Sequence, residues 1–244
     1  MSCKNQLMTF FIAILTVCFL TGCVDLSNNQ GGGYQVTDVE GTVITIAHKP
    51  QRILTVSAGT DELMLGLVEP ERMAAINESL ADREHTNIPW VCDRIPTVIP
   101  RSPSAEQIAA LHPDLVVVTP WMPRENIDAI RELNVPVLVC KSAATIEDIH
   151  DNIRLYAAAV GEVERGEKLI GMMEEKLAEI RAKVAEVPEE KKHKSIALIS
   201  IMVNYGGAGC TFDELCRCTD SINAKAAAGN RMGQEMTKEQ LVAA

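Results

Sequence analysis

The sequence predicts an α/β fold in which two lobes are joined by a long rigid helix and the second lobe is incomplete. Three observations predict it: a proline-free amphipathic stretch from Val163 to Val187, strands alternating with helices before that stretch, and a restart of the same pattern after it. Apolar residues recur along the stretch in steps of three and four, so they form one stripe on a helix of roughly 37 Å. A coiled-coil strand would carry the same stripe and is the alternative.

The first element in chain order is an export signal. Lys4 precedes an uncharged run from Leu7 to Leu20, which is too short to span a bilayer comfortably and is typical of a signal h-region. The tetrapeptide from Leu20 to Cys23 resembles the bacterial lipobox, so we expect cleavage after Gly22 and lipidation of Cys23. Residues 1–22 are thus a predicted lipoprotein signal peptide, and 23–35 a polar, glycine-rich, flexible tether. The alternative is an ordinary secretory signal followed by a chance cysteine.

Composition indicates a globular protein that does not bind nucleic acid. Hydrophobic residues make up 47% of the 244 residues, which is enough for a sizeable core. The formal net charge is −10, and this sign disfavours both nucleic acid and anionic lipid headgroups as partners.

A first lobe is predicted over residues 36–160, with strands and helices linked by short turns that imply a mainly parallel sheet. Prolines make residues 77–102 loop-like, and a capping box at Ser104 opens the helix that follows. In order, we expect a hairpin over 38–47, a strand over 52–57, a helix over 60–67 after a turn at Ala58-Gly59, a strand over 73–76, a helix over 104–111, a strand over 115–119, a helix over 126–133, a strand over 135–139 and a helix over 145–160.

After the connecting helix, taken as residues 161–188, the pattern restarts in a partial second lobe over 189–244. A strand over 194–201 and a turn at Gly206-Gly207 precede capping boxes at Thr211 and Thr237. Asp213-Glu214-Leu215 repeats Asp61-Glu62-Leu63, and the stretch from Thr237 repeats the one from Ser104. A strand like 115–119 should come next, so the second lobe is expected to lack roughly 40 to 60 residues of the repeat.

Cysteines leave one alternative function open. Cys3 and Cys18 leave with the signal and Cys23 is lipidated, and the remaining spacings match no common zinc pattern. Thiolates hold iron and iron–sulfur clusters, so a cysteine-ligated metal or redox module is the alternative function. Small buried thiols on a short helix are the simpler interpretation of Cys216 and Cys218. The remaining thiols are Cys92, Cys140, Cys210, Cys216 and Cys218.

Several stretches in this order resemble the siderophore and cobalamin family of ABC-importer substrate-binding proteins. They are Lys49-Pro-Gln-Arg-Ile53, Ser57 to Leu67, Ser104 to Val118 with its Leu-His-Pro-Asp-Leu, Leu133-Asn-Val-Pro-Val137, the connecting helix, and Thr237 to Leu241. The resemblance implies two Rossmann-like lobes that capture a metal chelate or corrinoid between them, change little on binding, and dock on a permease. It also implies an exposed carboxylate on each lobe for docking, which on the first lobe matches Glu125.

Candidate ligand-binding residues follow from topology, because ligands of open α/β sheets sit beyond the carboxyl ends of the strands. The tryptophans offer flat faces to a bulky chelate or corrin ring, although each could instead plug a lobe edge. Loop arginines, Arg83, Arg94 and Arg101, could pair with acidic groups on a ferric chelate, or could simply be solvated. The predicted binding residues are Ser57, Thr60, Trp90, Arg101, Trp121, Met122 and Tyr205.

Other function classes fit the sequence less well. A zinc or manganese binder needs several converging histidines, and only His85 falls in a predicted cleft loop. We find no Ser/His/Asp arrangement, phosphate loop or paired catalytic carboxylates, so the protein is predicted not to be an enzyme and to need no cofactor or resident metal. The expected function is therefore an extracytoplasmic, lipid-anchored binding protein for an iron(III)–siderophore chelate, with cobalamin or heme as the alternative ligands and an ABC importer permease as its partner.

Overall fold

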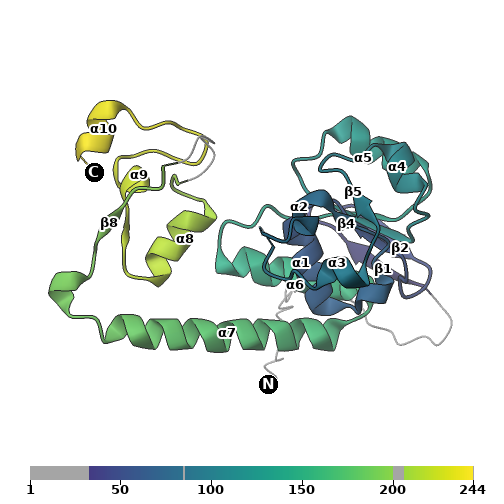
Figure 1. The fold of residues 1–244 in the computed structure, drawn as a ribbon, viewed down its shortest axis with the longest axis horizontal. Coiled ribbons are helices and arrows are strands. Elements are labelled where there is room, and N and C mark those ends of the chain that lie inside the picture. The colour runs from purple at the N-terminus through teal and green to yellow at the C-terminus, as the bar shows by residue number, and fades with distance from the viewer. Residues whose placement is uncertain (1–32, 85, 200–205, 244) are drawn as a thin grey trace, which may run out of the picture.

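Two α/β lobes lie at opposite ends of one long helix, α7 (Val163–Ala185), in the computed structural model, which describes residues 33–84, 86–199 and 206–243 (Figure 1). This arrangement confirms the predicted fold class. The helix ends at Ala185, ahead of Pro188, a residue that cannot continue the backbone hydrogen-bond ladder.

The first lobe is built on a parallel sheet of order β3-β6-β7 (Ile53–Thr55, Leu115–Val118 and Val137–Val139). All residues of these strands are buried, as expected when helices cover both faces. Leu115 and Val117 face a core shared with α1 (Ala58–Leu67) and α6 (Ile146–Val160). Their neighbours Val116 and Val118 face a second core shared with α4 (Ala105–Ala109) and α5 (Arg124–Glu132).

Two smaller ladders complete this lobe. A hairpin is present as β1 (Tyr34–Thr37) and β2 (Val43–Ile46), but its first strand lies ahead of the predicted range of 38–47 and begins before residue 36, where the sequence places the start of the lobe. A parallel pair, β4 (Ile76–Asn77) and β5 (Val98–Ile99), extends the sheet through a bridge between Met73 and Ile53. The predicted strand over 73–76 is therefore displaced toward Asn77, because the 3₁₀ turn η1 (Pro70–Arg72) occupies the chain just before it.

The stretch from 77 to 102 is not the simple loop that its prolines suggest. It contains α2 (Glu78–Ala81), α3 (Val91–Arg94) and β5. The Asn77 side chain caps α2 by accepting a 3.0 Å hydrogen bond from the Ser79 N–H. Helices of four residues contain too few turns for an apolar repeat, so periodicity could not reveal them.

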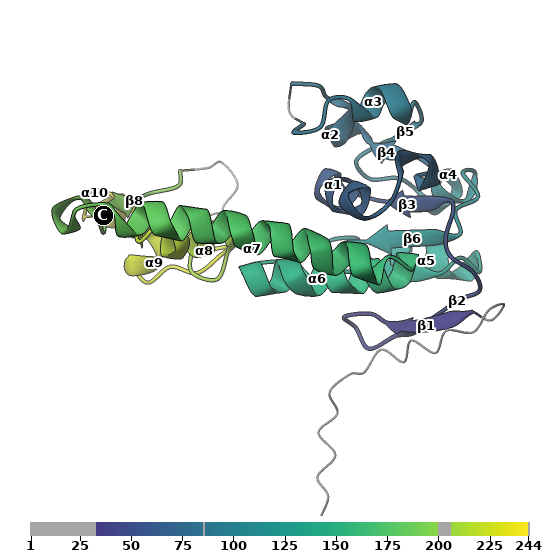
Figure 2. The same ribbon diagram turned by 90° about the horizontal axis from the view of Figure 1, so that it is seen from below.

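Helix α7 is fixed to the first lobe mainly by α6, which runs beside it (Figure 2). Gly166 is buried in this contact, where an added Cβ would lie 2.6 Å from the Cβ of Ala157. At the turn between the helices, Glu162 pairs with the guanidinium of Arg72 at 2.5 Å and with Lys49 at 2.7 Å. Arg72 also donates to the carbonyls of Pro50 and Val160, so one buried guanidinium ties the start of α7 to the lobe. In the described structure the helix packs against α6 of its own chain, so its apolar stripe does not need a coiled-coil partner.

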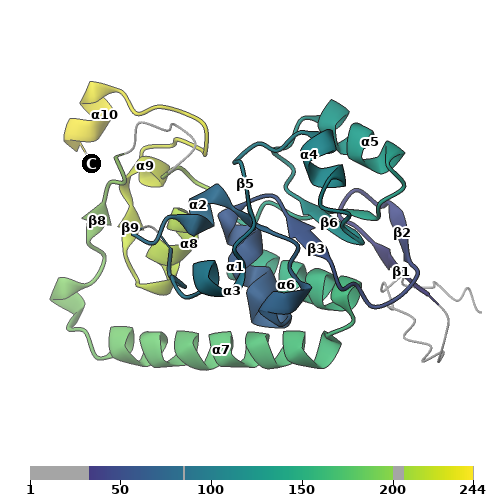
Figure 3. The same ribbon diagram turned by 45° about the vertical axis from the view of Figure 1, so that its right-hand side comes forward.

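The described part of the second lobe repeats the start of the first. Its strands β8 (Ser195–Ile196) and β9 (Ile222–Asn223) are parallel, with α8 (Thr211–Cys218) between them in the chain (Figure 3). Helices α9 (Ala224–Ala227) and α10 (Lys238–Ala243) follow, and the 3₁₀ turn η2 (Glu189–Lys191) precedes β8. The strand expected over 194–201 is described only to residue 199, and it pairs over two residues.

Capping boxes were predicted with mixed success. Those at Ser104 and Thr237 form as expected, with reciprocal bonds to Gln107 and Gln240. The box at Thr211 is wrong, because the N-cap of α8 is Cys210 and makes no side-chain cap. A further box forms at the start of α1, where Ser57 and Thr60 bond reciprocally and replace the predicted turn at Ala58-Gly59 by helix.

Candidate ligand-binding cleft

A cavity of about 930 Å³ lies between the lobes, at the carboxyl edge of the first-lobe sheet. Each strand of the β3-β6-β7 sheet leads into it: Ser57 follows β3, Thr119 follows β6 and Cys140 follows β7. Ligands of open parallel sheets bind at this edge. The volume falls within the usual range for sites that hold small molecules.

The second lobe closes the other side of the cavity. Gly209 to Phe212, at the start of α8, and Met232 line it opposite the first lobe. The Thr211 hydroxyl donates a 3.1 Å hydrogen bond to the carbonyl of Ala143 in the loop after β7. Thr211 is the first residue of α8 and not its N-cap, and its hydroxyl links the two lobes.

The loop after β7 is held by polar contacts with α6. Asn152 accepts from the N–H of Lys141 at 3.0 Å and donates to its carbonyl at 2.8 Å. The Lys141 ammonium lies 2.5 Å from Asp148, and this bond holds the pKa of the Asp148 carboxyl well below its usual range and raises the pKa of Lys141. Both groups are therefore charged at neutral pH and form an ion pair.

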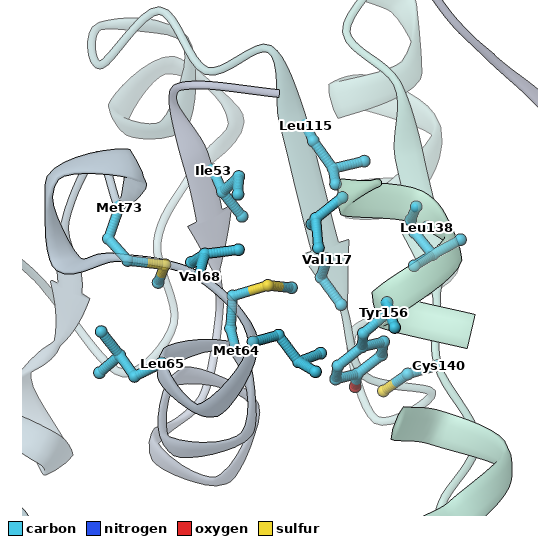
Figure 4. Close-up of a cluster of buried hydrophobic side chains, with 14 of the residues drawn as sticks. Ile53, Met64, Leu65, Val68, Met73, Leu115, Val117, Leu138, Cys140 and Tyr156 are labelled. Atoms are coloured by element: carbon cyan, nitrogen blue, oxygen red, sulfur yellow. The ribbon is translucent and has the colours of Figure 1, made fainter. Parts of the chain in front are cut away.

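The cleft wall passes directly into the hydrophobic core. Tyr156 of α6 is 1% exposed, and its hydroxyl points at the thiol of Cys140 (Figure 4). Burial raises the pKa of the Tyr156 hydroxyl and of the Cys140 thiol, so both groups keep their protons at neutral pH. Leu63, Ile149, Phe212 and Trp121 add apolar surface around them, and Trp121 is 68% exposed. The cavity is thus walled by apolar and aromatic groups, with a few neutral hydroxyls at its edge.

Three of the predicted binding residues line the cavity: Ser57, Thr60 and Trp121. Met122 does not, because its side chain packs against the core between the sheet and α4 and α5. Trp90 is also absent from the lining, and it lies in the separate segment that precedes α3. Tyr205 lies outside the described residues.

The predicted arginines are engaged elsewhere. None of the three lines the described cavity wall, and each pairs with a carboxylate of its own neighbourhood. The exposed guanidinium of Arg101 lies 3.5 Å from Glu78, outside the described cavity wall. The other two pairs are Arg83 with Asp93 and Arg94 with Glu71.

Metal-ligating residues are dispersed in the described part of the chain. No group of three or more His, Cys, Asp and Glu residues is placed there to hold a metal ion. His150, for example, is buried on α6 and faces Glu174 at 3.4 Å rather than the cleft. All five cysteines that remain after Cys23 are free thiols, and Cys140 and Cys210 line the cavity.

Sequence reasoning missed the loop from Cys140 to Ala144 and the side chains of Asn152 and Tyr156. The loop follows the third strand of the sheet, so the strand-end rule that selected Ser57 would have selected it as well. No comparable signal existed for Gly209 to Phe212, because their place depends on how α7 mounts the second lobe.

Comparison with known proteins agrees with this architecture. The family described as periplasmic binding protein matches the chain over residues 54–240. The probable siderophore-binding lipoprotein YfiY of Bacillus subtilis is 21% identical over 82% of this chain and 61% of its own length. The putative ABC transporter substrate-binding lipoprotein YhfQ of the same organism is 26% identical over 75% of this chain. This chain spans 61% and 57% of the lengths of these two relatives.

Solved structures share the fold at low sequence identity. The heme-binding protein HmuT superposes with a TM-score of 0.68 and 22% identity, over 89% of this chain and 72% of HmuT. The molybdate periplasmic binding protein MolA of Haemophilus influenzae superposes with a TM-score of 0.70 and 16% identity, over 86% of this chain and 71% of MolA. Within the residues described, no helix has the length and apolar character needed to cross a bilayer.

Proposed function

This chain belongs to the periplasmic binding protein family, and on that premise we propose that it captures an iron(III)–siderophore chelate between its lobes and delivers it to an ABC importer. Family members are solute-binding proteins, so the prediction that the chain is not an enzyme is confirmed. The observation that carries the proposal is the cavity of about 930 Å³ between the lobes. A ferric siderophore is a bulky chelate with apolar flanks, and the aromatic and apolar walls of the cavity suit such a ligand.

The name of one relative supports the choice of ligand. YfiY is described as a probable siderophore-binding lipoprotein, and its similarity extends over 82% of this chain. Heme and cobalamin are the competing ligands, because both are flat and large enough to use the same apolar walls.

We propose a lipid anchor at Cys23 and an extracytoplasmic location, in the periplasm or at the outer surface. Both relatives are described as lipoproteins, and the lipobox precedes Cys23 in this sequence, although Cys23 lies outside the described residues. Cys23→Ala should abolish partitioning into detergent and processing after Gly22, as read by mass spectrometry. An unmodified mature terminus elsewhere in the unsubstituted protein would remove the anchor from the proposal.

Glu125 is the proposed docking carboxylate of the first lobe. It is exposed in the first turn of α5, and it forms no ion pair within the described residues. The α5 helix follows the segment that carries Trp121, so Glu125 belongs to the same end of the lobe as the cleft. An exposed, unpaired carboxylate there can pair with a permease arginine without disturbing the ligand site.

A fluorescence titration tests the ligand assignment. Trp121 and Trp90 are the two tryptophans of the chain, and only Trp121 lines the cavity in its described part. Ferric hydroxamates, ferric catecholates, heme and cobalamin are titrated into the intact protein, with the Trp121→Phe variant as the control. A ferric chelate should quench the emission saturably, and the variant should lose most of that quenching. Absence of binding to any ferric chelate, together with tight binding of zinc or manganese, would overturn the proposal.

A further inference from the structure

Charge is scarce on the described cleft wall, and the one charged side chain found there is paired with two carboxylates that do not line the cavity. Of the described lining residues, Lys141 alone has a charged side chain. Its ammonium lies 2.5 Å from Asp148 and 3.6 Å from Asp151, so the cluster of Lys141, Asp148 and Asp151 carries a net negative charge. Asp148 also accepts backbone N–H bonds from Ala144 and Thr145, which fix it beside the lysine. The positive charge of Lys141 is therefore offset by its two carboxylate neighbours.

The side chains of the cleft that could coordinate a metal are also engaged. The thiol of Cys210 donates to the carbonyl of Gly207 at 2.9 Å, and its side chain is buried. Cys140 and the hydroxyl of Tyr156 face each other, and both are at most 3% exposed. A metal ion that needed a ligand from this wall would have to break one of these contacts and remove a proton from a buried group.

What the wall does offer is neutral hydrogen bonding and apolar contact. The hydroxyls of Ser57 and Thr119 line the cavity, and the first N–H groups of α8 begin at its far side. Such donors suit amide or hydroxamate oxygens, which carry partial rather than full negative charge. Trp121 and Phe212 offer aromatic faces from the two lobes to the apolar parts of the same molecule.

We propose that the cleft selects a ferric chelate that has no net negative charge and a complete iron coordination sphere, which is the chemistry of a ferric trihydroxamate. The selection comes from the negative cluster beside Lys141, from the pairing of the loop arginines with other carboxylates, and from the engaged thiols and phenol. This inference rests on the proposed function and specifies the chemical class of its ligand.

A pair of chelates matched in size tests the selection. Three hydroxamates neutralise ferric iron, whereas three catecholates leave the complex strongly negative. The intact protein should bind the ferric trihydroxamate at least about tenfold more tightly than the tricatecholate, and only the affinity for the tricatecholate should rise with salt concentration. The visible charge-transfer band of the bound trihydroxamate should match that of the free complex, because the protein adds no ligand to the iron.

A charge-reversing variant tests whether the cluster of Lys141, Asp148 and Asp151 causes the preference for the trihydroxamate. Asp151→Lys should shift the affinity ratio toward the tricatecholate by about threefold to tenfold. Glu132→Lys makes the same charge change at the far end of α5, away from the carboxyl edge of the sheet, and should leave both affinities unchanged. An unshifted ratio in Asp151→Lys would overturn the assignment to this cluster.

Failure of the inference and failure of the proposed function give different results. Equal or tighter binding of the tricatecholate, or a thiolate or phenolate band on the bound iron, overturns the inference and leaves siderophore capture in place. Binding of heme or cobalamin with no affinity for either ferric chelate overturns the proposed function itself.

Discussion

Asp61 is a fully buried carboxyl that fixes α1 against the sheet. It accepts a hydrogen bond from the Thr55 hydroxyl at the end of β3 and a 2.7 Å bond from the N–H of Asn77 at the end of β4. The same helix presents Ser57 and Thr60 to the cleft. Desolvation by burial raises the pKa of Asp61 from 3.8 to about 7.

This buried carboxyl predicts a dependence of stability on pH. Because the pKa is higher in the folded state than in the unfolded state, protonation of Asp61 stabilises the fold fully below about pH 4, and that stabilisation is lost as the pH rises to about 7. Denaturant unfolding of Asp61→Asn should lack this loss, which amounts to about 4 kcal/mol in the unsubstituted protein. An identical decline in stability between pH 4 and pH 7 in the two proteins would contradict the account.

Substitution of Trp121 tests whether the ligand contacts this side chain of the cavity wall. Since it is 68% exposed in the described structure, Trp121→Ala should leave the melting temperature nearly unchanged. Chelate affinity should fall by roughly 1 to 3 kcal/mol if the ring packs on the ligand. Trp90→Ala is the matched control, because Trp90 is 46% exposed and does not line the cavity. Calorimetry should measure the chelate affinity of both variants. An equal loss of affinity in the two would show that the ligand does not bind in the cavity beside Trp121.

The sequence predicted the segments that reach the cleft more accurately than it predicted the individual side chains that line it. The strand-end rule follows from parallel topology alone, and Ser57 and Trp121, which it selected, both line the cavity. It could not separate Trp121 from Met122, since neighbouring residues point in different directions and Met122 faces the core. Arg101 lies outside the described lining for a different reason: it pairs with Glu78, the first residue of the unpredicted helix α2.

The contact between α6 and α7 depends on a glycine. An added Cβ at Gly166 would lie 2.6 Å from the Cβ of Ala157, well inside contact distance, and neither helix has a flexible side chain there to yield. Gly166→Ala should therefore destabilise the protein by about 1 to 3 kcal/mol in denaturant unfolding, despite the better helix propensity of alanine. Gly171→Ala on the same helix is the control, because in the described structure nothing beyond the adjoining backbone of α7 lies within 4 Å of its added Cβ. That variant should be neutral or more stable by up to about 1 kcal/mol. Equal effects of the two substitutions would argue against close packing at Gly166.

The repeat recognised in the sequence has a structural basis in both lobes. Asp213 of α8 occupies the position of Asp61 in α1, and it accepts a 3.0 Å bond from the side chain of Asn223. Asn223 ends β9 as Asn77 ends β4, and each then caps the short helix that follows. The shared Asp-Glu-Leu motif thus marks a helix fastened to the end of the neighbouring strand.

Helices long enough to repeat their apolar pattern several times, and buried apolar strands, were predictable from the sequence. Helices of four residues were not. The long helices and the buried strands β6 and β7 follow from periodicity and apolar composition. The four-residue helices α2 and α3 hold their places through caps and tertiary packing, which no local pattern encodes. Thr211 shows the same limit, because its hydroxyl bonds to Ala143 of the other lobe instead of capping α8.

At the scale of the whole molecule, α7 and the contact between Thr211 and Ala143 set the two lobes around the cavity. The family resemblance implies that lobes joined in this way move little when ligand binds. The permease should therefore contact surfaces that are already formed before binding. Glu125→Arg should therefore reduce uptake in vesicles reconstituted with the cognate permease and leave chelate affinity intact, because it reverses a rim charge. Glu132→Arg, at the other end of α5, is the control and should transport normally. Uptake at the unsubstituted rate in Glu125→Arg would remove Glu125 from the docking surface.

Anomalous diffraction at the iron edge can locate a ferric chelate bound between the lobes. Crystals of the intact protein grown with a ferric trihydroxamate should show one iron peak in the cavity lined by Trp121 and Phe212. The peak should have no protein atom within coordination distance, because the thiols and the phenol of the wall stay engaged with each other and with the backbone. An iron peak outside this cavity, or none at saturating chelate, would contradict the account.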